Sequence, residues 1–305
     1  GGGGNTPPTA SSFTGANGPF ENLTYTFATS DFGYMDDDSD PLDHLQITAL
    51  PAAGTLYLDA DNDDVFDGGE SILVNDQISK ADMDAGNLQY FQNGSTNTSF
   101  QFNVNDGTES SASDYTATLN VLPVPTVALS VAPTSRLESQ STNNVVTATL
   151  SNVYGLNTTV NLSFSGTATL AEDYSRSGTA ISITAGSTTG TMTLVNIPDV
   201  LFEGDETVIV DIASVSNGTE DGTQQVTYTI TDDDPQPMVT LTQSQTEIAD
   251  ESGGRAFVTA VLDAAAGVTV SVPLLFSGTA DGGGTDYAIT AFTIEISPGE
   301  TKDSI

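Results

Sequence analysis

The chain contains a long internal repeat, and this repeat limits the folds that are open to it. Residues 164–168 read Phe-Ser-Gly-Thr-Ala and residues 276–280 read the same, a spacing of 112 residues from position 164 to position 276. An Asp-Tyr pair follows each copy, at 173–174 and at 286–287. A repeat of this length is a whole domain rather than one turn of a solenoid. We therefore expect an array of similar domains, about three in a chain of 305 residues.

Apolar residues occur in short runs separated by Thr, Ser, Gly and Asn, which is typical of β-structure. Residues 23–27 and 100–104 alternate apolar and polar side chains, as strands with one buried face do. Only residues 78–85 suggest a helical turn. We predict an all-β protein of tandem Greek-key β-sandwiches, immunoglobulin-like or cadherin-like at the start. No run approaches the roughly 18 apolar residues of a membrane span, so no membrane insertion is expected.

Proline-containing segments divide the chain, because proline cannot donate to a central strand ladder. We expect a Gly/Pro-rich linker or entry segment at 1–19 and sandwiches at 20–122, 123–236 and 237–305. The strand-like runs of the second sandwich are 127–131, 145–150, 159–164, 180–183, 191–195, 207–212 and 226–231. The third copy stops at Ile305, opposite Met192 in the second, and so lacks its last strands. Either the chain continues, or another polypeptide supplies the missing edge.

The charge of the chain excludes some partners and requires an explanation of its own. Forty-one acidic against five basic side chains give a net charge of −36, which repels nucleic acid and anionic lipid. Two like charges 4 Å apart cost about 4 kcal/mol at an effective dielectric near 20. Bound divalent cations would relieve this repulsion, and a solvated surface adapted to high salt is the alternative. With no cysteine in the chain, no disulfide stiffens it.

Acidic residues of the second sandwich gather at the ends of its strands. Glu138 follows the first strand, Asp173 lies in the middle, residues 199–206 carry four acids, and residues 232–234 are all Asp. Together with the Phe-Ser-Gly-Thr-Ala and Asp-Tyr elements, this order and spacing resemble the Calx-beta domain, a calcium-binding sandwich. The resemblance covers residues 126–234 fully and 238–305 in part.

The resemblance implies that one end of the second sandwich holds Ca²⁺. Carried over position by position, the implied ligands are Glu138, Asp173, Asp199, Glu203, Glu206, Asp232, Asp233 and Asp234. One departure is that the family's acidic loop opens with two adjacent Asp, whereas this chain has Pro198 before Asp199. In the third sandwich Glu251 and Asp286 match, but the acidic loop and the terminal Asp run are missing.

The first sandwich carries a separate acidic loop at residues 59–70. Its acids fall at relative positions 1, 3, 5, 9 and 12, the spacing of an EF-hand calcium loop, with a backbone carbonyl offered at position 7. These ligands are Asp59, Asp61, Asp63, Val65, Asp67 and Glu70. However, Asp64 stands where the sharp turn favours Gly, and the flanks 55–58 and 71–74 read as strands. We predict a calcium loop inserted in a β-hairpin, with a solvated acidic loop as the alternative.

The remaining motifs of the first sandwich resemble the cadherin-like repeats of large bacterial adhesins. They are residues 34–42, 50–56 and 105–107, and the similarity spans about residues 20–122. A catalytic arrangement is missing from the sequence, because Cys is absent and the single histidine, His44, is expected to face solvent beside an acidic run. We therefore predict a protein that is not an enzyme.

These observations favour a structural role. We expect a calcium-binding segment of an extracellular adhesin or fibre, at a bacterial-type cell surface or in a matrix, that calcium makes rigid. The expected partners are Ca²⁺, neighbouring copies through strand exchange, or other surface proteins. The second hypothesis is a self-assembling filament subunit whose third sandwich accepts a strand. Carbohydrate or protein recognition by a loop surface is a third, although the chain has no Trp for an aromatic platform.

Overall fold

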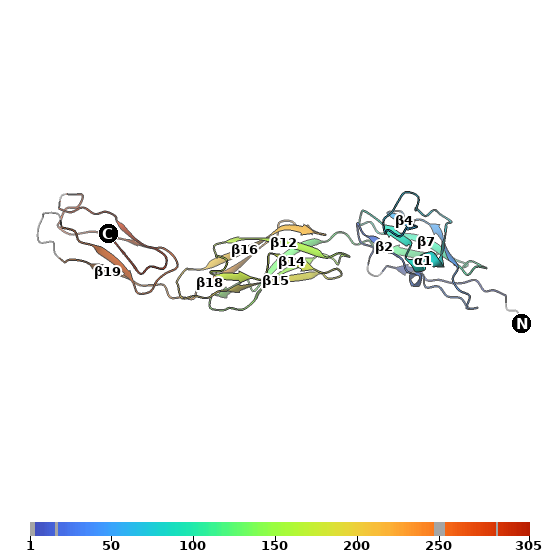
Figure 1. Ribbon diagram of the computed structural model, residues 1–305, viewed down its shortest axis with the longest axis horizontal. Coiled ribbons are helices and arrows are strands. Elements are labelled where there is room, and N and C mark those ends of the chain that lie inside the picture. The colour runs from blue at the N-terminus through green and yellow to red at the C-terminus, as the bar shows by residue number, and fades with distance from the viewer. Residues whose placement is uncertain (1–3, 16–17, 247–253, 285) are drawn as a thin grey trace.

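The computed structural model describes residues 4–15, 18–246, 254–284 and 286–305. Figure 1 shows three β-rich units that follow one another along the long axis, the first at the right and the third at the left. Each unit has its own buried hydrophobic cluster. The all-β fold class is thus confirmed, while the exact domain boundaries stay a prediction. The helices among the described residues are too short to cross a membrane.

The first unit packs two sheets around an aromatic core. One sheet has the order β1 (Phe13–Thr14), β8 (Tyr115–Leu119), β7 (Thr98–Asn105), β3 (His44–Ala49) and β5 (Gln77–Ser79). The other has the order β2 (Thr24–Thr26), β6 (Leu88–Phe91) and β4 (Thr55–Leu58). Two short helices, η1 (Thr29–Phe32) and α1 (Lys80–Ala85), connect strands. Phe32 and Phe102, both fully buried, meet edge to face with ring centroids 4.9 Å apart.

The alternation of β7 explains how the sequence selects this core. Phe100, Phe102 and Val104 are fully buried, whereas the residues between them are partly or fully exposed. The expected helical turn at 78–85 is divided, because Ile78 belongs to β5 and the helix begins after Ser79, whose hydroxyl accepts a hydrogen bond from the Asp82 amide.

For the first unit, the structure favours an entry segment over a linker at residues 4–15, and it corrects the strand expected at 71–74. Residues 4–15 do not lead freely to the unit as a linker would, since Phe13 pairs with Ala117 in a parallel ladder and Ala10 is buried. Residues 71–74 do not form a strand, because only Ser71 bridges to Tyr57 before the chain turns. The Ile72 amide still donates to the Leu56 carbonyl at 3.2 Å, so the acidic loop does join two antiparallel segments.

The second unit is a sandwich of two five-stranded sheets. The first sheet has the order β10 (Ser135–Leu137), β18 (Gln225–Thr231), β16 (Glu206–Ser216), β12 (Thr158–Gly166) and β14 (Ala180–Ile183). The second has the order β13 (Tyr174–Arg176), β15 (Thr189–Asn196), β11 (Asn144–Leu150), β9 (Thr126–Ala132) and β17 (Thr219–Glu220). All seven expected runs are strands. Three further strands, β10, β13 and β17, were not predicted. Each has at most three residues, too few to show the alternation of buried and exposed side chains.

The third unit repeats part of this plan. Its sheets are β19 (Val239–Gln243), β20 (Val258–Leu262) and β23 (Lys302–Ser304), and β21 (Val270–Pro273) with β22 (Thr293–Ile296). The buried core of its described residues is small: Ala260, Leu262, Ile294 and Ile296. Within those residues nothing occupies the place that β16 takes beside β12 in the second unit. Leu275, the counterpart of the exposed Ser163 in the second unit, is 96% exposed.

Candidate metal centre

A short parallel strand pair brings the first group of carboxylates together in the second unit. β10 pairs with β18 in parallel, with Leu137 opposite Thr231, so both strands end at the same edge. Glu138 follows β10 directly and Asp232 follows β18 directly. The Glu138 amide donates to the Thr231 carbonyl at 2.8 Å, which continues the ladder by one residue. This register, rather than proximity in sequence, places Glu138 beside Asp232.

The first carboxylate group consists of Glu138, Asp232 and Asp234, whose ligand oxygens lie within 4.8 Å of one another. Glu138 is only 5% exposed. Burial raises the pKa of its carboxyl. The hydrogen bond from the Asp199 amide acts to lower this pKa, but the charges of Asp199, Asp234 and Asp232 raise it. Burial and the neighbouring Asp charges likewise raise the pKa of Asp234. Three acids held this close in a partly desolvated place favour a bound cation or a proton.

The second carboxylate group consists of Asp173, Glu203 and Glu206, again within 4.8 Å of one another. Asp173 immediately precedes β13 and Glu206 begins β16, so strands of both sheets contribute. Burial, followed by the charge of Asp173, raises the pKa of Glu203 to about 7. Burial, a hydrogen bond with Asp173 and the Asp173 charge raise the pKa of Glu206 to about 8.

Asp232 joins the two groups. Its Oδ2 accepts the amides of Glu203 at 2.9 Å and Gly204 at 2.6 Å, while its Oδ1 accepts the Asp234 amide at 2.9 Å. The position of the acidic loop therefore depends on a carboxylate of the first group. The two groups form one continuous acidic end of the sandwich, which we call the acidic end.

These raised pKa values predict how the metal-free protein responds to pH. A carboxyl whose pKa is higher in the folded than in the unfolded state stabilises the fold below its ordinary pKa and loses that contribution as pH rises through the folded value. For Glu203 and Glu206 this window runs from about 4.5 to about 7 and 8. Calorimetry in a chelator should show the second unit unfolding several degrees lower at about pH 9 than at about pH 6.

A matched variant assigns that pH dependence to the acidic end. The side chain of Glu206→Gln cannot ionise, so this variant should lose much of the difference in unfolding temperature between the two pH values. Glu172→Gln changes an exposed acid outside both groups and should keep that difference. An unfolding temperature that rises with pH in the chelated parent would contradict the assignment.

Two predicted ligands of the second unit lie outside these groups. The Asp199 amide donates to Glu138 Oε1 at 2.8 Å, while Asp199 Oδ1 accepts the Leu201 amide. Asp199 is thus adjacent to the first group without belonging to it. Asp233 is exposed, and its Oδ2 accepts the Ser139 hydroxyl at 2.6 Å. The structure therefore separates Asp233 from the acidic end, although the sequence places it between two members.

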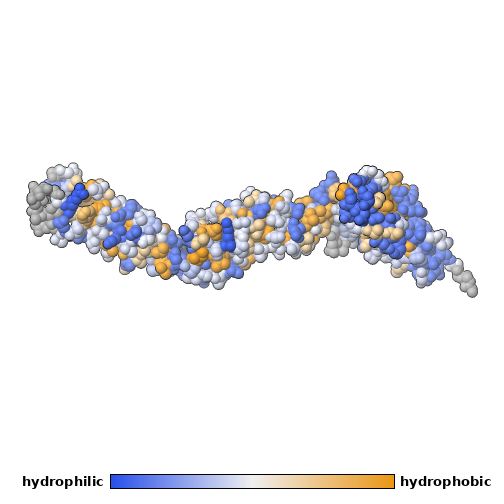
Figure 2. Space-filling model, viewed as in Figure 1, coloured by the Kyte–Doolittle hydropathy of each residue, from blue (hydrophilic) through white to orange (hydrophobic). Residues whose placement is uncertain are grey.

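The acidic loop of the first unit also brings carboxylates together. Asp59, Asp61 and Glu70 form one group within 4.8 Å, and Asp61, Asp63 and Asp67 form another, so Asp61 belongs to both. The charge of Asp63, with burial and the other loop acids, raises the pKa of Asp61. The Val65 side chain is 55% exposed. Figure 2 shows strongly hydrophilic surface over this unit.

Asp59 is the structural centre of this loop. It is fully buried, and its Oδ1 and Oδ2 accept amides of the loop, including that of Asp64 at 2.9 Å. Burial acts to raise its pKa, but the amides of Asp64, Asn62 and Asp63 outweigh burial and hold the pKa below its ordinary value. Asp64 adopts φ 60°, the left-handed conformation that Gly would favour, and its side chain accepts from Gln89. The missing glycine therefore does not prevent the turn.

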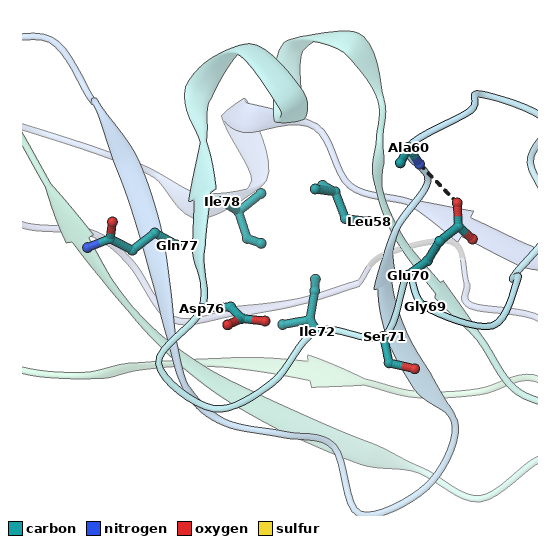
Figure 3. Close-up of a pocket in the computed structure, with 9 residues that line it drawn as sticks. All are labelled: Leu58, Ala60, Gly69, Glu70, Ser71, Ile72, Asp76, Gln77 and Ile78. Atoms are coloured by element: carbon teal, nitrogen blue, oxygen red, sulfur yellow. Dashed lines mark hydrogen bonds between the residues drawn. The ribbon is translucent and has the colours of Figure 1, made fainter.

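Glu70 closes the loop. Its Oε1 accepts the Ala60 amide at 3.0 Å, as Figure 3 shows, and its Oε2 accepts the Asp67 amide at 2.8 Å. Beside it is an open pocket of about 280 Å³, into which Leu58, Ile72 and Ile78 point toward one another. These two hydrogen bonds hold Glu70 near Asp59.

Of the two predicted ligands of the third unit, the structure describes Asp286 alone. Glu251 lies outside the described residues. Asp286 Oδ2 accepts the Asp281 amide at 2.7 Å, and Asp286 belongs to none of the carboxylate groups found among the described residues. His44 also departs from expectation, since its side chain is only 14% exposed and its Nδ1 lies 2.8 Å from Asp43 Oδ2.

Comparison with known proteins gives one family. A family model described as the Calx-beta domain matches residues 122–234 and again residues 232–305. No curated protein matches the chain. Among solved structures, CBD12 from CALX1.2 has 21% identity, covers 58% of this chain and 74% of its own, and has a TM-score of 0.32. The calcium binding domain CBD12 of CALX1.1 has 22% identity, and the match covers 59% of this chain and 73% of that one, with a TM-score of 0.32. The apo-form Calx CBD1 domain has 20% identity, and the match covers 36% of this chain and 99% of that one, with a TM-score of 0.30.

Proposed function

Since the chain belongs to the Calx-beta family over residues 122–234 and 232–305, we propose that it is a calcium-binding structural segment of an extracellular surface fibre or adhesin. The observation that carries this proposal is the acidic end of the second unit, where two groups of three carboxylates meet. Calx-beta domains are non-catalytic, which agrees with a structural role.

The residues of the acidic end fit calcium. Ca²⁺ takes about 6–8 hard oxygen ligands, and every side chain of both groups offers carboxylate oxygen. Glu138, Asp232 and Asp234 would hold one ion, and Asp173, Glu203 and Glu206 another, with Asp199 adjacent to the first group. Bound calcium would neutralise the acids whose pKa values are raised in its absence.

The acidic end lies at the junction with the third unit, which supports a mechanical role for calcium. Phe202 forms a parallel bridge with Ala266, and the Gly267 amide donates to the Phe202 carbonyl at 3.0 Å. Glu203, a member of the second carboxylate group, is the next residue. A cation that fixes this loop would also fix the surface on which the third unit rests. Calcium would therefore limit bending at this junction.

An extracellular location agrees with this use of calcium. Extracellular modules work with dissociation constants of about 10⁻⁴–10⁻³ M, so a site of modest affinity can be filled there. The loop of residues 59–70 stays a prediction as a further calcium site, and the cadherin-like assignment of the first unit stays one as well.

Calorimetric titration and small-angle scattering test the proposal together. Calcium should bind to the metal-free protein with saturable heat, and chelation should broaden the distribution of particle dimensions. Asp61→Asn in the same titration would remove any binding that comes from residues 59–70, and leave that of the acidic end. Absence of saturable binding in the parent would overturn the proposal.

A second candidate, a self-assembling filament subunit, rests on the open side of the third unit. Val160 and Leu162 are buried in the second unit, whereas their counterparts Val272 and Leu274 are only half-buried. A strand from another copy would cover them, as β16 covers β12. A particle mass above that of one chain in the same scattering experiment would favour this candidate.

A further inference from the structure

The second and third units carry the same loop, anchored in the same way. It comprises residues 151–157 after β11 and residues 263–269 after β20. The Ser151 amide donates to the Thr126 carbonyl at 2.9 Å, and the Asp263 amide donates to the Met238 carbonyl at 3.1 Å. Each loop is thereby tied to the start of its own unit.

A second anchor is also repeated. The Gly186 amide donates to the Tyr154 carbonyl at 2.9 Å, and the Gly299 amide donates to the Ala266 carbonyl at 2.8 Å. Because two hydrogen bonds hold each loop to its own sandwich, the loop moves with that sandwich. Whatever the loop contacts beyond it is a contact between units.

At the first junction this loop packs against the first unit. Tyr154 is only 4% exposed, and its hydroxyl donates to the Glu21 carbonyl at 2.9 Å. Its ring meets that of Phe20 edge to face, with centroids 5.7 Å apart. The linker is held from both sides, since the Val124 amide donates to Glu21 Oε2 at 3.1 Å and Asn152 donates to the Pro123 carbonyl at 3.0 Å.

Gly155, the next residue, allows the two units to approach closely. A Cβ atom at this position would lie 2.7 Å from Leu23 Cδ1 and 3.0 Å from Phe20 Cδ2, and both are atoms of the first unit. The φ angle of Gly155 is outside the left-handed region, so its own backbone would accept alanine. An alanine at position 155 would therefore press on side chains of the neighbouring unit rather than strain its own backbone.

The third unit uses the same position. A Cβ atom at Gly267 would lie 2.5 Å from Glu203 Cγ of the second unit, and Ala266 is 1% exposed where the other loop has Tyr154. The same loop thus meets two different neighbours: the Tyr154 ring packs on Phe20 at the first junction, and Gly267 lies beside Glu203 of the acidic end at the second.

We propose that residues 151–157 and 263–269 are docking loops, each of which joins its Calx-beta domain to the unit before it. At the first junction the partner is an apolar surface of Phe20 and Leu23 with the Glu21 backbone carbonyl. The carboxylate groups found in the described residues contain no member of this surface. The first junction is therefore held by packing and hydrogen bonds, and its geometry does not depend on a metal ion.

Spin-label distances in the full chain test this directly. The chain has no cysteine, so Ser95→Cys in the first unit and Ser182→Cys in the second give one label each at exposed positions. The distance distribution should be narrow, and the same with calcium and with chelator. Gly155→Ala should broaden it by about twofold or more, because units without a close interface move relative to each other.

Two further variants distinguish docking from damage to the fold. Gly178→Ala is the matched control, since a Cβ there would meet only the Ala180 carbonyl, at 3.9 Å, and should leave the distribution unchanged. Tyr154→Phe removes only the hydrogen bond to Glu21 and should give an intermediate width. A parent distribution that broadens on chelation, or a Gly155→Ala distribution as narrow as that of the parent, would overturn the proposal.

Discussion

Calcium added to the metal-free protein is expected to raise the unfolding temperature of the second unit by on the order of 15 °C or more. A ligand that binds only the folded state stabilises it by about 4 kcal/mol at a thousandfold excess over its dissociation constant. For a domain of slightly more than 100 residues, such as the second unit, each kcal/mol shifts the midpoint by roughly 4 °C. Differential scanning calorimetry with and without chelator measures the shift.

The size of this effect follows from the acidic end itself. Without a cation, burial first and the neighbouring acids second raise the pKa values of Glu138, Glu203 and Glu206, so ionising these carboxyls costs the folded state free energy. The unfolded chain separates these charges, so the repulsion acts on the folded state alone. Calcium removes that repulsion and adds its own ligand bonds.

Magnesium at the same concentration is the control for general screening of the charge of −36. Mg²⁺ requires near-ideal octahedral geometry and gives up its water reluctantly, so it should produce a much smaller shift. An equal shift with both ions would show that screening, and not a calcium site, stabilises the protein.

Asp232→Asn is expected to weaken calcium binding at the acidic end by about 100-fold or more. Loss of even an outer partner of a metal ligand costs about 10–100-fold in affinity, and Asp232 has two roles here. It belongs to the first carboxylate group, and its Oδ2 accepts the amides of Glu203 and Gly204 that position the second group. Isothermal titration of the full chain gives the affinity.

Asp233→Asn is the charge-matched control for this variant. It removes the same charge from the adjacent residue, but Asp233 is exposed and bonded to the Ser139 hydroxyl. Its effect should stay within about threefold, as expected for an exposed charge. Equal losses in the two variants would mean that diffuse negative charge, rather than a defined site, attracts calcium.

The sequence allowed the all-β class to be predicted because its strands alternate clearly. β7 and β11 bury every second side chain, and the predicted strand at 55–58 has the same first and last residues as β4. The internal repeat revealed the array of similar units. By contrast, residues 4–15 were expected to be a linker or entry segment on composition alone, and the burial of Ala10 could not be read from their Gly and Pro content.

The members of the acidic end were predicted better than their arrangement. Six of its predicted residues meet in two groups, because all of them lie at strand ends or in the acidic loop at one end of the sandwich. The separation of Asp233 from Asp232 and Asp234 was missed because the family resemblance carried over all three residues, although successive side chains of a strand point to opposite sides. The parallel pairing of β10 with β18 was missed as well, because a strand of three residues is too short to carry a periodic signal.

That parallel pair has a consequence for a chain under tension. β9 and β10 lead from the first junction toward the acidic end, and β18 leaves the second unit at that same end. A stretching force therefore draws β10 and β18 lengthwise in opposite directions, so their hydrogen bonds must break together rather than one after another. An ion bound by both Glu138 and Asp232 would hold the ends of the two strands together and so resist this sliding.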